Sequence, residues 1–490
     1  MIMRKRSGRS FRRLVVWCIL GVLGILQLIV LPRLVLGPPA ITASLNTIPL
    51  TYHYDPIYST VHCIGETFST GSDDSSWKYR SCEYKNICID LVDKDYVLFV
   101  SPQDPKLHQT LSKSSYSSTS LLHQNLTVSL SSVNPRWTGE AAHKHLNPNA
   151  VAWHPKIIAK PPEAYYMLPE STVLVPFVSM GGHNKGHMLW DDFFPIYTLL
   201  TSFGLLSGED KFSPLLLRTV LQTPLYGTCD IQKKKTKKCH DNYRQLLPLL
   251  GIDPATMSTL QDMRFASTTT SDSSIRYVCA AHGAAGIGML NDHGAHDHGW
   301  DMGDRSATIP HTIGRGPLFF QFRQFMVQNL LGSSTSIAKA QKPKVVLSIH
   351  SSTDLGRDLD FVNAISNLKK NFGAIADIQA VEFAQMSLVE QVVLARSSSI
   401  FVTVCGGGAF TATFLPRGAS LILYYDDRGG AKFTNNRLVP TNTPARLDWD
   451  LWHNAATHLR VHWLTLQELN TPQGLQSLMQ LVKYELDRLT

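Results

Sequence analysis

The chain has 490 residues, of which 43% are hydrophobic and 17% charged. It can therefore bury a large core over two or three domains and is not generally disordered. The formal net charge is +8, but seven positive residues lie in the first 33 positions without an acidic one, so the remainder is close to neutral. This distribution argues against a nucleic-acid-binding protein, because it implies no broad basic surface outside the terminus.

The N-terminal segment predicts a membrane anchor. Residues 14–31 contain no charge and are rich in Leu, Ile and Val, which is close to the shortest length that crosses a bilayer. Positive residues precede this stretch, so we expect a cytosolic tail over 1–13, a single transmembrane helix over 14–36 and a stem over 37–60. The rest of the chain would then face the lumen of the Golgi or endoplasmic reticulum. A cleaved signal peptide is the alternative.

The eight cysteines agree with an oxidising compartment. Cys229 and Cys239 would close a short loop, and one pair is expected among the early cysteines Cys63, Cys82 and Cys88. Either Cys279 or Cys405, both in apolar surroundings, is expected to stay unpaired. The sequon Asn125-Leu126-Thr127 predicts a glycan on Asn125.

The first half of the chain alternates apolar strand-like runs with polar segments. Residues 96–101, 172–179 and 276–281 are predicted strands, and a helix is predicted from His187 towards Ser202. Solvated loops are predicted at 112–120, at the lysine-rich run 233–238 and at the histidine-rich stretch 291–304.

The second half alternates helices and strands more regularly. The predicted order is a helix over 319–331, a strand over 344–349, a helix over 361–372 and a strand over 378–382, with one or two helices over 465–489. Such alternation indicates a doubly wound parallel sheet. We therefore predict two α/β lobes, 61–315 and 316–490, with a ligand cleft between them.

The segment 387–425 predicts a helix, a strand, a glycine turn, a helix and a strand. Ser387 and Glu390 have the spacing of a capping box, and residues 400–404 form a short β-branched run. The glycines at 406–408 follow this strand directly, so bare backbone N–H groups and a helix start would meet at the carboxyl edge of the sheet, where a phosphate can bind. The alternative is an ordinary tight turn.

A histidine and a carboxylate are predicted to share one helix face in the first half. In the segment 181–197, His187 and Asp191 are four residues apart, Asn184 joins the same face, and Asp192 points elsewhere. An imidazole beside a carboxylate at a cleft is a workable general-base arrangement. The alternative is a bond within the helix that has no chemical role.

Together these two segments resemble glycosyltransferase family 61. The run HNKGHMLWDDFFPIYTL resembles the family's N-terminal-lobe motif, and EQVVLARSSSIFVTVCGGGAFTATFLPRGASLI resembles its donor-lobe motif. Protein O-mannose N-acetylglucosaminyltransferases and β-1,2-xylosyltransferases are the similar members. The matching motifs cover roughly 60 residues, and their order and the lumenal topology agree as well.

The resemblance implies a GT-B-like fold of two Rossmann-type lobes, preceded by the transmembrane helix. It implies inverting transfer of xylose or N-acetylglucosamine from a UDP-sugar to a hydroxyl of a glycan or glycoprotein. No cofactor or metal ion is then required, because the UDP-sugar is a co-substrate. Asp191 is the first candidate base and His187 its alternative or partner. Asn184, Asp192 and His183 are expected around the acceptor.

The resemblance also suggests a set of donor-binding residues. The Arg357 guanidinium is expected on phosphate, with a surface arginine as the alternative. Glu390 could bind a sugar hydroxyl or only cap its helix. The full predicted set is Arg357, Glu390, Gln391, Cys405, Gly406, Gly407, Gly408 and Thr411.

The chain departs from the family at Cys405, where the family has histidine. A thiol is a poor hydrogen-bond donor, so a non-catalytic sugar-nucleotide- or glycan-binding protein on the same fold is the alternative function. A metalloenzyme built on His293, His296 and His298 is a further alternative.

Overall fold

The computed structural model describes residues 51–65, 76–93, 95–101, 126–133, 151–170, 172–179, 182–206, 215–219, 233–252, 276–288, 290, 315–332, 342–349, 362–425, 450–469 and 471–489. The chain divides into two compact units, Met1–Thr47 and Ile48–Thr490, and all described residues belong to the second. In the part of the chain that the structure describes, no helix is long and apolar enough to cross a bilayer. The predicted anchor over 14–36 lies outside that part.

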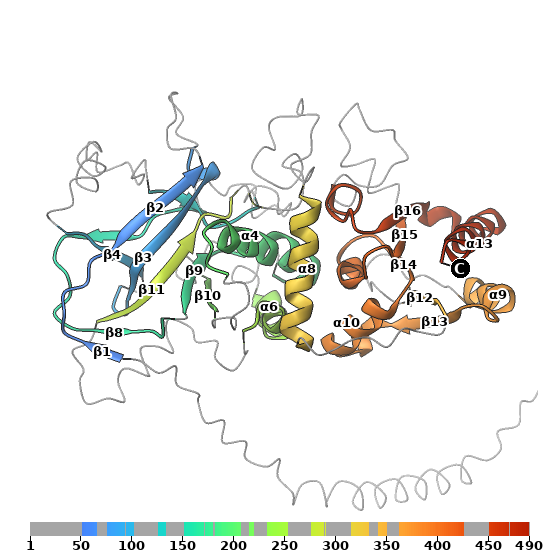
Figure 1. Cartoon of the computed structure of the whole chain (residues 1–490), viewed down its shortest axis with the longest axis horizontal. Coiled ribbons are helices and arrows are strands. Elements are labelled where there is room, and N and C mark those ends of the chain that lie inside the picture. Colours follow the sequence, from blue (N-terminus) through green and yellow to red (C-terminus); the bar gives the residue numbers. More distant parts are fainter. Residues whose placement is uncertain are drawn as a thin grey trace, which may run out of the picture. The chain divides into compact units, whose positions relative to one another are not determined.

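The C-terminal half contains the predicted parallel sheet (Figure 1). Its strands are β12 (Lys344–Ile349), β13 (Asp377–Glu382), β14 (Ile400–Val404), β15 (Ser420–Tyr425) and β16 (Arg460–Thr465). They are ordered β13-β12-β14-β15-β16, and every neighbouring pair is parallel. The chain therefore reverses its direction of winding between β12 and β14, which is the topological switch point of a doubly wound fold.

Helices cover both faces of this sheet. One face packs against α9 (Val362–Phe372) and α13 (Pro472–Asp487), through buried side chains such as Val345, Ile400 and Ile422. The other packs against α10 (Leu388–Ser397) and the 3-10 helix η8 (Gly407–Phe414), through Val346, Phe401 and Leu421. The alternation of these side chains between faces follows from the two-residue period of a strand.

The N-terminal half has a mixed sheet, which corrects the prediction of two Rossmann-type lobes. It has nine strands, and half of their pairs are antiparallel: β3 (Arg80–Asp90) runs antiparallel to β2, β4 and β11, and β1 to β8. Parallel pairs join β9 to β10 and to β11. The bounds are β1 Thr51–His53, β2 Thr60–Gly65, β4 Asp95–Phe99, β7 Lys156–Ile158, β8 Tyr165–Met167, β9 Val173–Phe177, β10 Leu215–Thr219 and β11 Tyr277–Ala285; β5 (Val128–Ser129) and β6 (Ala152–Trp153) form a separate pair.

Disulfides fasten the N-terminal sheet. Cys63 of β2 pairs with Cys82 of β3, and Cys88 of β3 pairs with Cys279 of β11. The first pair agrees with the prediction for the early cysteines, and Cys279 is paired rather than left as a thiol. Cys239 is also disulfide-bonded, to a partner outside the described residues, whereas Cys405 carries a buried thiol. Cys229 and the predicted glycan site Asn125 lie outside the described residues.

A single hydrophobic cluster joins the two sheets. We call it the central cluster; it contains Phe177 of β9, Phe194 and Leu199 from the helix after it, Phe319 and Phe322 of α8 (Gly316–Leu331), and Phe401 and Leu421 of the parallel sheet. Helix α8 contacts α4 (Phe194–Ser202) and the 3-10 helix η5 (Leu247–Leu250) on one side, and α10, η8 and the π-helical turn η9 (Asp450–Ala455) on the other (Figure 1). The two lobes are therefore packed together through apolar side chains.

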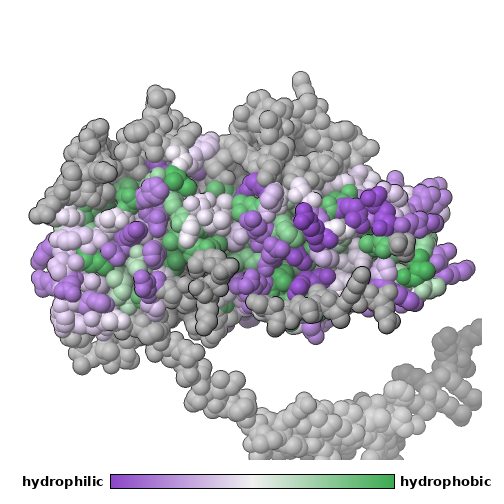
Figure 2. Space-filling model, in the orientation of Figure 1, coloured by the Kyte–Doolittle hydropathy of each residue, from purple (hydrophilic) through white to green (hydrophobic). Residues whose placement is uncertain are grey.

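Two further predictions need correction. Residues 233–238, predicted as a solvated loop, begin helix α6 (Lys233–Leu246), because lysine is a good helix former and the helix buries Tyr243 and Leu246. Within the segment predicted as a stem, Thr51–His53 is strand β1 and pairs with β8. On the face drawn in Figure 2, hydrophilic and hydrophobic residues are intermixed over the described surface.

Candidate functional site

The helix that carries His187 and Asp191 changes its winding in the middle. Asn184 is the N-cap, and its Oδ1 accepts a hydrogen bond of 2.9 Å from the Gly186 N–H. The turn α3 (Lys185–His187) continues into a π-helical segment, Met188–Phe193, and then into α4. π-Helical turns are rare and frequently occur at functional sites. Asn184 thus caps the helix through its Oδ1.

His187 and Asp191 form the predicted pair. His187 Nδ1 lies 2.8 Å from Asp191 Oδ2. The His187 side chain is 21% exposed, whereas that of Asp191 is 1% exposed. The Ser132 hydroxyl donates a hydrogen bond to the Asp191 carbonyl oxygen and so fixes the backbone at this position. The carboxylate therefore lies behind the imidazole, and the imidazole is the member of the pair that a substrate can reach.

Asp192 is buried on a different side of the helix. It accepts hydrogen bonds from the Ser179 hydroxyl at 2.5 Å and the Tyr243 hydroxyl at 3.1 Å. Burial, together with the negative charge of Asp191, raises the pKa of Asp192 well above its usual range. Asp192 therefore ties the helix to the segment after β9 and to α6. His183 lies just before the N-cap and is partly exposed.

The glycine turn after β14 has the predicted position but not the predicted helix type. Gly406 has φ 101° and is the N-cap of η8, which is a 3-10 helix rather than an α-helix. A residue with a side chain is strained at such a φ, so glycine is required there. Cys405 is 9% exposed, and its N–H donates to the Tyr424 carbonyl of the neighbouring strand. The N–H groups that begin η8, from Gly407 and Gly408, have no partner within the helix itself.

Glu390, Gln391 and Thr411 have structural partners. Ser387 and Glu390 make both bonds of the predicted capping box. The Gln391 Nε2 donates to the carbonyl oxygens of Phe383 and Met386 at 2.9 and 3.0 Å, and its Oε1 accepts from the Thr411 hydroxyl at 3.1 Å. Gln391 and Thr411 thus fix η8 against α10. Arg357 lies outside the described residues.

The structure brings the two sequence motifs together. Helix α3 contacts η8, although more than 200 residues separate them. The Trp190 indole N–H donates to the Thr413 hydroxyl at 3.2 Å, and Lys185 Nζ lies 5.9 Å from the centre of the Phe410 ring. The imidazole–carboxylate pair and the glycine turn therefore belong to one region of the molecule.

Lys185 is a site residue that sequence reasoning missed. The residue is only partly exposed, and burial, with the charge of Lys238, lowers the pKa of Lys185. No carboxylate among the described residues pairs with it. A desolvated ammonium between the His187 helix and η8 favours an anionic ligand. The sequence signal that identifies Lys185 is its position in the same motif, two residues before His187.

Two buried hydroxyl groups mark the carboxyl edge at the switch point. Ser348 of β12 and Thr403 of β14 are 1% and 0% exposed, and neither hydroxyl has a hydrogen-bond partner. The register pairs Leu347 with Val402, which places Ser348 next to Thr403. Both lie on the face covered by η8, because each is two residues beyond a member of the central cluster. Unsatisfied buried hydroxyls are rare in proteins, and ligand binding is one explanation for them.

Replacing Thr403 with valine tests whether its hydroxyl contributes to the stability of the unliganded protein. Because its hydroxyl is unpaired, Thr403→Val is expected to raise the free energy of unfolding of the unliganded protein by about 1 kcal/mol. The matched control is Thr413→Val, also at a fully buried position, which should lower it by about 1–3 kcal/mol because the Trp190 N–H loses its acceptor. Denaturant unfolding of both variants measures whether each substitution raises or lowers the free energy of unfolding. Equal destabilisation would show that Thr403 has an overlooked partner.

The described residues contain no group of three or more His, Cys, Asp or Glu that could hold a metal ion. His293, His296 and His298 lie outside the described part.

No protein-family model matches the chain, and no curated protein matches it. Seventeen chains of solved structures match. One is Escherichia coli heptosyltransferase WaaC with ADP, at 12% sequence identity, with 64% of this chain and 99% of that chain covered and a TM-score of 0.27. A likeness at this TM-score carries no argument about function, which depends on the geometry described above.

Proposed function

We propose that the protein is an inverting glycosyltransferase that moves xylose or N-acetylglucosamine from a UDP-sugar to a hydroxyl of a glycan or glycoprotein. The observation that carries the proposal is the contact of α3 with η8, which brings a solvent-reachable imidazole next to a glycine turn at the switch point of a doubly wound sheet. Ligands of such sheets bind at that edge. The resemblance of both motifs to glycosyltransferase family 61 supports the same reaction.

His187 is the general base in this proposal, and Asp191 orients it. The buried carboxylate accepts a hydrogen bond from the His187 Nδ1–H and stabilises the imidazolium that forms. The other ring nitrogen takes the proton from the acceptor hydroxyl. The acceptor oxygen then attacks the anomeric carbon from the face opposite UDP, and the bond from that carbon to the diphosphate breaks. This assignment reverses the sequence-based preference for Asp191 as base, since Asp191 is almost fully enclosed.

The leaving diphosphate needs positive groups and hydrogen-bond donors that stabilise its growing negative charge. The Lys185 ammonium and the N–H groups that begin η8 supply positive charge and donors on one side. Such preorganised groups do not require a metal ion. The predicted role of Arg357, on the segment after β12, remains part of the proposal.

Removal of the Lys185 charge tests donor binding. We expect Lys185→Ala to weaken UDP binding about tenfold, because a desolvated ammonium contributes about 1.4 kcal/mol or more to an anion. The matched control is Lys237→Ala, a lysine in α6 that is 86% exposed and pairs with Asp241. Calorimetric titration of the full-length chain with UDP measures both. Equal UDP affinity in the Lys185 and Lys237 variants would place the nucleotide elsewhere.

The second candidate is a binding protein without transferase activity. Cys405 favours it, because a buried thiol replaces the family histidine beside the glycine turn. A panel of UDP-sugars, assayed for hydrolysis and transfer by the unmutated protein, separates the two candidates. Binding without turnover supports the second.

We also propose that the protein faces the lumen of the Golgi or endoplasmic reticulum, held by residues 14–36. The two disulfides of the N-terminal sheet and the bonded Cys239 support an oxidising compartment.

A further inference from the structure

A group of positive and polar side chains surrounds Phe320 on α8. The guanidinium carbons of Arg323 and Arg417 lie 5.7 and 5.8 Å from the centre of the Phe320 ring. The His458 ring is centred 5.0 Å from the same ring. We call Arg323, Arg417 and His458 the Phe320 cluster. It draws on three separate parts of the chain: α8, the loop before β15, and the loop before β16.

The two inner members of the cluster carry buried nitrogen atoms without a hydrogen-bond partner. Arg323 is 7% exposed and His458 is 8% exposed. Arg323 donates to the Phe414 carbonyl oxygen at the end of η8 through one terminal nitrogen, but its Nε has no partner. Neither ring nitrogen of His458 has one. Buried polar atoms are nearly always satisfied in native proteins, so three such atoms in one cluster call for a partner.

The charges in the cluster are also uncompensated. Within the described part of the chain, no carboxylate pairs with Arg323, Arg417 or His458. Burial first, and then the positive charge of Arg396, lowers the pKa of Arg323 to about 10. Burial and the charges of Arg323 and Arg417 lower the pKa of His458 to about 3. Both pKa values are lowered, as expected where buried positive groups lie close together without an anion.

The cluster lies at the opposite edge of the parallel sheet from the proposed sugar-nucleotide site. Arg417 precedes β15 and His458 precedes β16, so both are at the amino ends of their strands. The glycine turn follows the carboxyl end of β14. Strands of five or six residues span roughly 17–20 Å, so one ligand of diphosphate size does not reach both places.

We infer that the Phe320 cluster is a second anion-binding site, which takes a phosphate or sulfate group. Arginine forks match the oxygens of such a group, and Arg417 is the exposed member of the cluster. The anion supplies acceptors for the Arg323 Nε and for a His458 N–H, and it offsets the charge of the arginines. The group is either a free ion or the substituent of a phosphorylated sugar. This inference is independent of the proposed transferase activity.

The test is calorimetric titration of the full-length chain with inorganic phosphate, in the presence of saturating UDP to occupy the other site. Saturable binding is expected, and Arg417→Ala should weaken it at least tenfold. Because Arg417 is exposed, this variant should fold. The matched control is Arg488→Ala, an exposed arginine of the C-terminal end that lies 5.4 Å from the Tyr484 ring. Its phosphate affinity should equal that of the unmutated protein.

A second titration with glucose 6-phosphate identifies the source of the anion. Tighter binding than inorganic phosphate assigns a phosphorylated sugar, and weaker binding assigns the free ion; both support the site. Absence of saturable binding of either probe overturns the inference, as does equal affinity in Arg417→Ala and Arg488→Ala.

Discussion

Asp191→Asn is expected to lower the rate of sugar transfer on the order of 10²–10⁴-fold, the range over which a general base acts. The asparagine amide would present an N–H to His187 Nδ1 and stabilise the wrong tautomer, and it would no longer stabilise the imidazolium. His187→Gln is expected to cause a loss of the same size. UDP affinity should stay within about twofold in both variants, because the pair acts on the acceptor.

The measurement is the release of UDP from UDP-xylose and UDP-N-acetylglucosamine, with and without candidate acceptors. Asp241→Asn is the matched control, since Asp241 pairs with Lys237 at the surface of α6. A double variant that loses no more than either single variant indicates that the two residues act as one unit. Full activity in Asp191→Asn would remove the pair from the mechanism.

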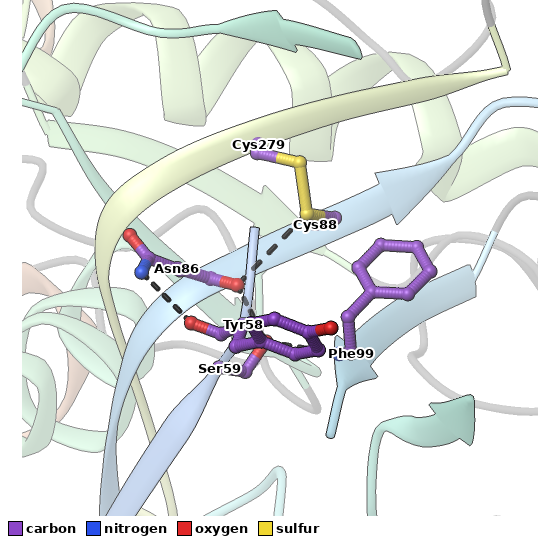
Figure 3. Close-up of a disulfide and its surroundings, with 6 residues drawn as sticks. All are labelled: Tyr58, Ser59, Asn86, Cys88, Phe99 and Cys279. Atoms are coloured by element: carbon purple, nitrogen blue, oxygen red, sulfur yellow. Dashed lines mark hydrogen bonds between the residues drawn. A yellow bond between two sulfur atoms is a disulfide. The ribbon is translucent and has the colours of Figure 1, made fainter. Parts of the chain in front are cut away.

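Loss of the Cys88–Cys279 disulfide is expected to have the largest effect on stability. The bond joins β3 to β11 across 191 residues of sequence, and both cysteines are fully buried (Figure 3). The chain-entropy relation gives about 5 kcal/mol for a loop of this length. For Cys63–Cys82, which closes a separation of 19 residues, it gives about 3 kcal/mol.

The two double alanine variants, at Cys88 with Cys279 and at Cys63 with Cys82, should be compared by denaturant unfolding of the full-length chain. Beside the longer link, Ser59 donates to the Asn86 carbonyl at 2.7 Å and accepts from the Phe99 N–H at 3.0 Å, so these segments stay aligned when the bond is removed (Figure 3). A smaller loss for Cys88–Cys279 than for Cys63–Cys82 would contradict the entropic account.

The parallel sheet was the part of the fold that the sequence predicted best. Strands β12 and β14 are short β-branched runs, so local pattern was sufficient for residues 344–349 and 400–404. Strand β16 (Arg460–Thr465), which mixes polar and apolar residues, was not predicted. The mixed sheet was harder. Strand β3 mixes buried residues with Glu83, Lys85 and Asn86, and its apolar pattern makes sense only beside β2, β4 and β11.

The candidate site was predictable where its residues are close in sequence. The spacing of His187 and Asp191 places them on one helix face, and Ser387 with Glu390 forms the predicted cap. Spacing does not show which member of the pair is enclosed by the fold. The exposures of His187 and Asp191 therefore came only from the structure. Ser348 and Thr403 were missed because their meeting depends on the register of two strands that are more than 50 residues apart.

The central cluster limits how the two lobes can move. A hinge that opened widely would expose Phe319, Phe322 and their neighbours to water, and each fully buried aromatic side chain resists exposure by about 1.5–3 kcal/mol. Large interdomain rotation is therefore unfavourable in this molecule. Under the proposed function, the imidazole of His187 would therefore keep its position near the glycine turn throughout a reaction cycle, without a wide opening of the two lobes.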